Sequence, residues 1–143
     1  MAVRLVFAIA CLIALVPMCS ARAGSEPIGI WQTQAGDARV RVSRCGGGIC
    51  GVVVWLKNPI ANGKPAVDDK NPNPALARRP MIGLSLFSGM RSAGEGKWSG
   101  QIYNADDGST YASKISMTGP DMLRVEGCVG VLCGGENWTR VGH

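Results

Sequence analysis

Apolar residues recur at nearly every second position after residue 27, which is the spacing of a β-strand with one buried face. Gly, Pro, Asp or Asn bounds each alternating run, as turns require. No segment has the spacing of an amphipathic helix, apart from one short candidate turn over 74–79. The pattern predicts an all-β protein with eight strands, over residues 28–33, 38–45, 50–57, 81–88, 97–104, 110–117, 122–128 and 136–142.

Short connections join most of these strands, and short connections favour antiparallel hairpins. Eight such strands can close into an up-and-down barrel, which leaves no sheet edge, or form a two-sheet sandwich. We expect the eight-stranded antiparallel up-and-down barrel, as a single domain over residues 24–143. In such a barrel, alternate connections share an end. One end then carries 34–37, 58–80, 105–109 and 129–135, and the other carries 46–49, 89–96 and 118–121.

One face of each predicted strand is almost entirely aliphatic or small, and we assign it to the barrel interior. The opposite face carries mostly Arg, Lys, Ser, Gln and Glu. One strand breaks this rule, because Val53 and Trp55 are apolar on the side assigned outward. The predicted inward residues are Val40, Val42, Val52, Val54, Leu56, Ile82, Leu84, Leu86, Trp98, Gly100, Ile102, Tyr111, Ser113, Ile115, Met117, Leu123, Val125 and Gly127.

Residues 1–23 have the organisation of a Sec-type signal peptide. A basic start at Arg4 precedes an apolar run, and the run ends in the small-residue cleavage signal Ala21-Arg22-Ala23. The apolar run is short for a helix that spans a bilayer. We expect cleavage after Ala23 and a periplasmic or secreted protein. Cleavage removes Arg4 and Arg22 and lowers the formal net charge from +5 to +3, which is too small to indicate nucleic-acid binding.

Four cysteines remain after cleavage, as two pairs with equal spacing. In an oxidising compartment they predict disulfides, and a four-thiolate zinc site is disfavoured there. The topology puts the two pairs at opposite ends of the barrel, about 20 Å apart. That distance exceeds the limit of about 7 Å between the Cα atoms of a disulfide. The predicted bonds are therefore the local ones, Cys45–Cys50 and Cys128–Cys133.

The motif Gly29-Ile30-Trp31 resembles the G-x-W signature of lipocalins. In that family the Trp closes one end of the barrel and an Arg from the end of the chain stacks on it. The resemblance implies that Trp31 and Arg140 form this structural pair. The two residues agree with the topology, because the start of the first strand and the finish of the last lie at the same end.

A wider resemblance covers nearly all of residues 24–143. It rests on Gly29-Ile30-Trp31 and on six further segments, and it is to domain-of-unknown-function family 2147, a group of small exported bacterial proteins. The resemblance implies a lipocalin-like barrel and supplies no reaction. The matching segments are 45–56, 69–74, 79–83, 98–104, 107–111 and 127–141.

The sequence offers few groups for catalysis or metal binding. The single His is the last residue, His143, which excludes a positioned imidazole. The polar run 68–73 is not an EF-hand, because Pro74 and Pro80 stand where Gly and Glu are needed. Asp106 and Asp107 would need a desolvated carboxylate for acid–base work, whereas a hairpin tip is solvated. We expect no enzyme activity, no metal and no cofactor.

The barrel interior is the remaining candidate site. Eight strands enclose just enough space for side chains or for one small ligand. A fully packed core is therefore the alternative to a binding cavity. Because the predicted interior is nearly all aliphatic, a ligand would be apolar or amphipathic. The residues that we expect to contact it are Val54, Leu84, Trp98, Tyr111, Ile115 and Leu123.

The connection 58–80 is long and rich in proline, and such loops are often lids or binding loops. The loop could equally be a cover that packs on Trp55. If Val53, Trp55 and this loop form one exposed apolar surface, the protein is instead an envelope interaction or structural protein without a cavity. We expect ligand binding inside the barrel, with this interaction surface as the alternative, and a monomer in both cases.

Overall fold

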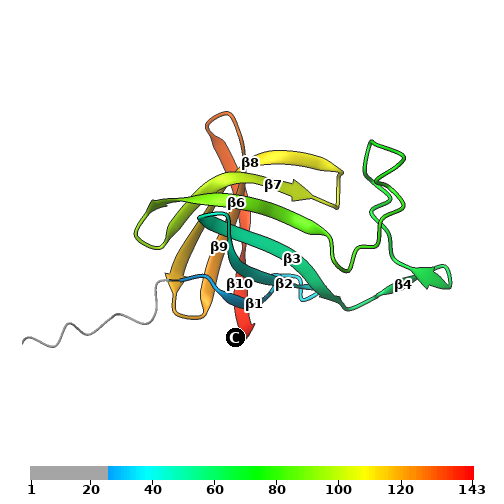
Figure 1. The fold of residues 1–143 in the computed structure, drawn as a ribbon, viewed down its shortest axis with the longest axis horizontal. Coiled ribbons are helices and arrows are strands. Elements are labelled where there is room, and N and C mark those ends of the chain that lie inside the picture. Colours follow the sequence, from blue (N-terminus) through cyan, green and yellow to red (C-terminus); the bar gives the residue numbers. More distant parts are fainter. Residues whose placement is uncertain (1–25) are drawn as a thin grey trace, which may run out of the picture.

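A computed structural model describes residues 26–143, so the predicted signal peptide and its cleavage site lie outside the described residues. Within this range eight strands close into one antiparallel barrel, in the order β1-β10-β9-β8-β7-β6-β3-β2 (Figure 1). This confirms the predicted all-β up-and-down barrel. The barrel strands are β1 Gly29–Gln32, β2 Ala38–Cys45, β3 Gly48–Leu56, β6 Ser85–Gly94, β7 Lys97–Asn104, β8 Ser109–Gly119, β9 Met122–Val129 and β10 Leu132–Gly142.

The long connection between β3 and β6 contains a small hairpin that the alternation did not predict. Its strands are β4 Ile60–Ala61 and β5 Lys64–Pro65, joined by Asn62 and Gly63. Both turn residues have positive φ, of 52° and 73°, as a two-residue hairpin turn requires. The Asn62-Gly63 pair therefore indicates a hairpin turn that could have been recognised in the sequence. Figure 1 shows this connection projecting from one end of the barrel.

One end of the barrel is closed by Trp31, which is fully buried. Its indole N–H donates to the carbonyl oxygen of Pro27 at 2.7 Å. The guanidinium carbon of Arg140 lies 4.2 Å from the centroid of the Trp31 ring. Arg140 also donates to the carbonyl oxygens of Ile28 and Pro120. The pair implied by the lipocalin resemblance is thus in contact and joins β1, β10 and the turn before β9.

Two predicted inward residues of β3, Val52 and Val54, are wrong, because the buried positions of this part of the strand are shifted by one residue. Val53 is only 2% exposed, and it pairs with the core residue Val40 across β2 and β3. The inward positions are therefore Ile49, Gly51 and Val53 rather than Val52 and Val54. A bulge at Val54 then shifts the alternation by one residue, so that the residues after it face as predicted. Three consecutive valines made the alternation ambiguous, and the register with β2 decides it.

The inward face predicted for the strand over 81–88 is also partly wrong. This strand, β6, starts at Ser85 and runs to Gly94, and Ile82 before it is 50% exposed. The pairing with β3 shifts register twice, at Leu86 and again beyond Phe87. These bulges rotate the strand, so that Phe87 and Met90 enter the core. The Phe87 ring occupies the space over Gly51, where a Cβ atom would overlap it.

Each end of the barrel carries one disulfide within a hairpin. Cys45 and Cys50 are bonded where β2 turns into β3, and Cys128 and Cys133 are bonded where β9 turns into β10. Both bonds are local, with Cα separations of 5.8 and 4.0 Å. Residues 26–143 include no helix that is long and apolar enough to cross a membrane.

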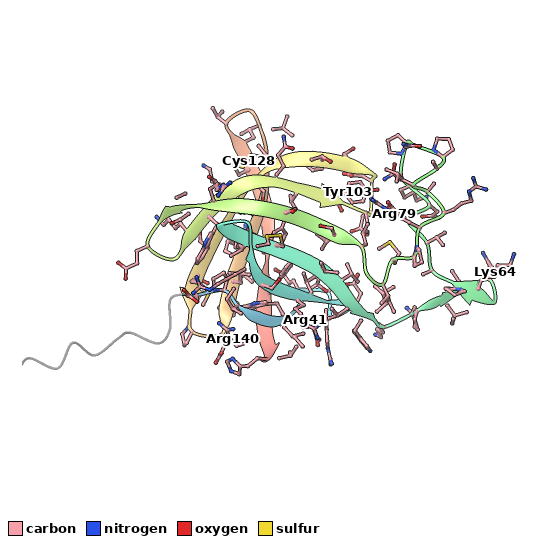
Figure 2. The ribbon with its side chains drawn as sticks, viewed as in Figure 1. Arg41, Lys64, Arg79, Tyr103, Cys128 and Arg140 are labelled. Carbon is pink, nitrogen blue, oxygen red and sulfur yellow. A yellow bond between two sulfur atoms is a disulfide. The ribbon has the colours of Figure 1, made fainter. Side chains whose placement is uncertain are left out.

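A buried carboxylate anchors the long connection to the barrel. Asp68 accepts hydrogen bonds from the Tyr103 hydroxyl at 2.6 Å, from Asn71 at 3.0 Å and from Arg79 at 2.9 Å. The Arg79 guanidinium also lies 5.3 Å from the centroid of the Tyr103 ring. Figure 2 shows Arg79 and Tyr103 together at the end opposite Arg140. The connection is therefore fixed to β7, and Asp68 is neutralised by Arg79.

The same connection packs closely on the hairpin between β7 and β8. Gly108 has φ of 73°, and a Cβ atom there would overlap the carbonyl oxygen of Lys70. We predict that Gly108→Ala lowers the free energy of unfolding by about 2–3 kcal/mol, from left-handed strain plus displaced backbone. Gly63 also has φ of 73° but nothing within 4 Å of a Cβ atom. Gly63→Ala should therefore cost only about 1 kcal/mol.

Denaturant unfolding of both variants measures this difference. Equal losses of stability would contradict the close contact between Lys70 and Gly108, because the two sites share the same φ and differ in that contact.

Candidate functional site

A cavity of about 710 Å³ occupies the half of the barrel away from Trp31. Its rim is formed by the connection after β1, the long connection after β3, and the hairpins β7–β8 and β9–β10. These four connections are the ones that the topology, read from the sequence, placed together at one end of the barrel. Its apolar walls come from Val53, Leu56, Met81, Leu86, Ile102, Val125, Val129, Leu132 and Trp138.

The interior is hollow in this half because two facing positions of its wall are glycines. The other half is filled by a buried cluster that includes Trp31, Phe87 and Met90. The cavity wall instead contains Gly127 and Gly134, which face each other across β9 and β10. Nothing lies within 4 Å of the position that a Cβ atom of Gly134 would take. The size of a few side chains therefore divides the barrel into a packed half and an open half.

Glu136 brings a carboxylate into the cavity wall. It lies two residues before the buried Trp138 on β10, so both side chains are on the inward face. The indole N–H of Trp138 donates to the Glu136 carboxylate. This bond holds the carboxylate against the wall while leaving its charge in place.

Tyr111 also lines the cavity, and its hydroxyl donates to Asp107 at 2.6 Å. This hydrogen bond lowers the pKa of Asp107 and raises the pKa of Tyr111. The lowered pKa keeps Asp107 ionised, whereas a general acid would need the opposite shift. At the rim, burial and the hydrogen bond to Asp68 raise the pKa of Tyr103.

Ser113 lies at the boundary between the two halves. On the inward face of β8 it stands between Tyr111, in the cavity wall, and Ile115, in the core. It is 3% exposed, and its hydroxyl has no hydrogen-bond partner among the described residues. A buried unpaired hydroxyl costs about 1–3 kcal/mol, and Ser113 is not among the residues that line the cavity.

The six residues predicted to contact a ligand do not lie together in the structure. Only Tyr111 lines the large cavity. Ile115 and Leu123 are fully buried in the packed half, and Leu84 is also buried. Trp98 packs against the core near the closed end, and Val54 lies on the side of β3 opposite Val53. These five residues therefore lie outside the lining of this cavity.

The residues that replace them were partly visible in the sequence. Leu56, Leu86, Ile102 and Val125 were predicted to face inward and do line the cavity. Trp138 and Glu136 were missed, although their spacing of two places them on one strand face. The signal was weak because Gly134 and Gly135 precede them, so this part of β10 shows no apolar alternation.

We predict that both tyrosines of the chain titrate above the ordinary pKa of 10.0 in the folded protein. A raised pKa means that the folded state holds the phenolic proton more tightly. The stabilisation is therefore complete below about pH 10 and is lost as the pH rises through each folded pKa. Ultraviolet titration of tyrosinate, with Tyr103→Phe and Tyr111→Phe isolating each group, measures this. A pKa of 10 or lower for either tyrosine would contradict its hydrogen bond to the carboxylate.

Comparison with known proteins gives a family and a fold. The family model described as "Uncharacterized protein conserved in bacteria (DUF2147)" matches residues 29–140. A solved structure described as "Protein HP1028 from the human pathogen Helicobacter pylori belongs to the lipocalin family" is similar, with a TM-score of 0.70 and 24% sequence identity. The similarity covers 81% of this chain and 83% of that chain, and at this identity it shows the fold alone. A comparison with curated proteins found no match. The chain has a lipocalin-like barrel and belongs to the DUF2147 family of uncharacterised bacterial proteins.

Proposed function

We propose that this protein binds one small apolar or amphipathic molecule in the open half of its barrel. The observation that carries the proposal is the cavity of about 710 Å³ beside a well-packed half. Binding sites for small molecules have volumes of about 300–1,000 Å³ and combine apolar walls with a few polar groups. The cavity has this composition, with aliphatic walls and the polar groups of Tyr111 and Glu136.

We also propose that the protein works in the periplasm or outside the cell, after cleavage behind Ala23. Its two disulfides support this location, because such bonds persist in oxidising compartments and are rare in the bacterial cytosol. A carrier in that location would hold apolar molecules out of water between membranes or after secretion.

An interaction surface around Trp55, without a cavity, has less support. Val53, one of its two proposed anchors, lies inside the barrel. Trp55 is 37% exposed, and the guanidinium of Arg39 stacks 4.6 Å from its ring centroid. The surface would then consist of the exposed side chains of Ile60, Val67 and Leu76 on the long connection, beside an indole that Arg39 already covers.

We predict that Gly134→Phe closes the cavity and lowers the affinity for the neutral dye N-phenyl-naphthylamine at least about tenfold, equal to 1.4 kcal/mol. The new ring would enter open space, since nothing lies within 4 Å of its Cβ position. Stability should not fall, because Gly is unfavourable in a strand. Dye fluorescence measures binding, and thermal unfolding checks the fold.

The matched control is Lys114→Phe, which places the same ring on the exposed outer face of β8. It should leave dye affinity unchanged. Equal affinity of the Gly134→Phe variant and the unsubstituted protein would contradict binding in the cavity.

A further inference from the structure

The charged side chains around the cavity are all of one sign. Within residues 26–143, Asp37, Asp106, Glu126 and Glu136 line it, and no Lys, Arg or His does. This distribution contrasts with the whole chain, which has 15 basic and 10 acidic residues and a formal charge of +5. The basic residues therefore face elsewhere, and the entrance to the cavity is negative in a positive protein.

No ion pair within residues 26–143 neutralises the carboxylates of Asp37, Asp106 or Glu136. Asp37 accepts a hydrogen bond from the neutral hydroxyl of Thr33 at 2.6 Å. Glu136 accepts one from the neutral indole of Trp138. Such bonds orient a carboxylate and leave its full negative charge. In a half-enclosed apolar site this charge acts more strongly than in water, because the low-dielectric walls focus the field.

Two other acids near the cavity do not contribute to this field in the same way. Glu126 borders the cavity, but it alternates with the inward residues of β9, and its carboxylate lies 3.9 Å from Arg124. Asp68 is paired with Arg79 at 2.8 Å. Glu136 is thus the carboxylate that stands inside the barrel without a cationic partner among the described residues.

We propose that the ligand carries a positively charged amino or ammonium group, which binds at Glu136, and an apolar part that lies against Leu86, Ile102 and Val125. This proposal rests on the proposed function, since it names the class of molecule that the cavity takes. A protonated amine forms a charge-assisted hydrogen bond with a carboxylate and is attracted to aromatic faces, here those of Trp138 and Tyr111. A fatty acid would instead bring its carboxylate towards three others.

Three probes with the same alkyl chain test the charge alone: decylamine, decanol and decanoate, titrated calorimetrically at neutral pH below their micelle concentrations. We expect decylamine to bind about tenfold or more tightly than decanol, and decanoate to bind most weakly. Glu136→Gln should remove the advantage of decylamine over decanol, so that the ratio of the two affinities falls to about one. The Gln side-chain oxygen can still accept the Trp138 hydrogen bond, so the fold should persist.

Glu95→Gln is the matched control, because it removes the same charge from the exposed hairpin between β6 and β7, at the closed end of the barrel. It should leave the ratio of decylamine to decanol affinity unchanged. If decanoate binds as tightly as decylamine, or if Glu136→Gln leaves that ratio intact, the cationic class is wrong and the cavity remains a binding site. If none of the three probes binds, the proposed function and this inference both fail.

Discussion

Closure of the barrel depends on β1, whose four residues are the only link between β2 and β10 in the described chain. Trp31 fills the barrel beneath this strand, and the Arg140 guanidinium lies 4.2 Å above its ring. A contact of this kind contributes about 0.5–2 kcal/mol. Arg140 also bonds to the carbonyl groups of Ile28 and Pro120, so one side chain holds three segments that are distant in sequence. If β1 detached, β2 and β10 would become two exposed sheet edges.

The cavity exists because the large core side chains fill the barrel at its closed end and leave the other half open. Eight strands enclose a space that side chains can fill completely. Here the large residues gather around Trp31, and the bulges of β6 turn Phe87 and Met90 towards them. Gly127 and Gly134 leave the other half without comparable volume. A difference of a few side chains thus separates a solid barrel from one with a cavity.

The architecture was readable from the sequence, whereas the site was readable only in part. Period-two alternation and turn residues were sufficient for the barrel, its strand order and the sets of connections that share each end. They could not set the phase of β3, because Val52, Val53 and Val54 are equally apolar and only the pairing with β2 distinguishes them. They also could not show the two bulges of β6, the first of which turns Phe87 into the core. Glu136 was missed because it begins the predicted strand 136–142 and two glycines precede it, so no apolar alternation showed that it faces inward.

Methyl NMR spectra recorded during a titration with decanol test most directly whether the barrel interior has a packed half and an open half. Decanol is a probe without charge. The account predicts shifts at Leu56, Leu86, Ile102 and Val125, which line the cavity, and none at Val40, Val42 and Leu123, which lie in the packed core. Shifts confined to surface methyl groups, or spread equally over both sets, would contradict a binding cavity in the open half of the barrel.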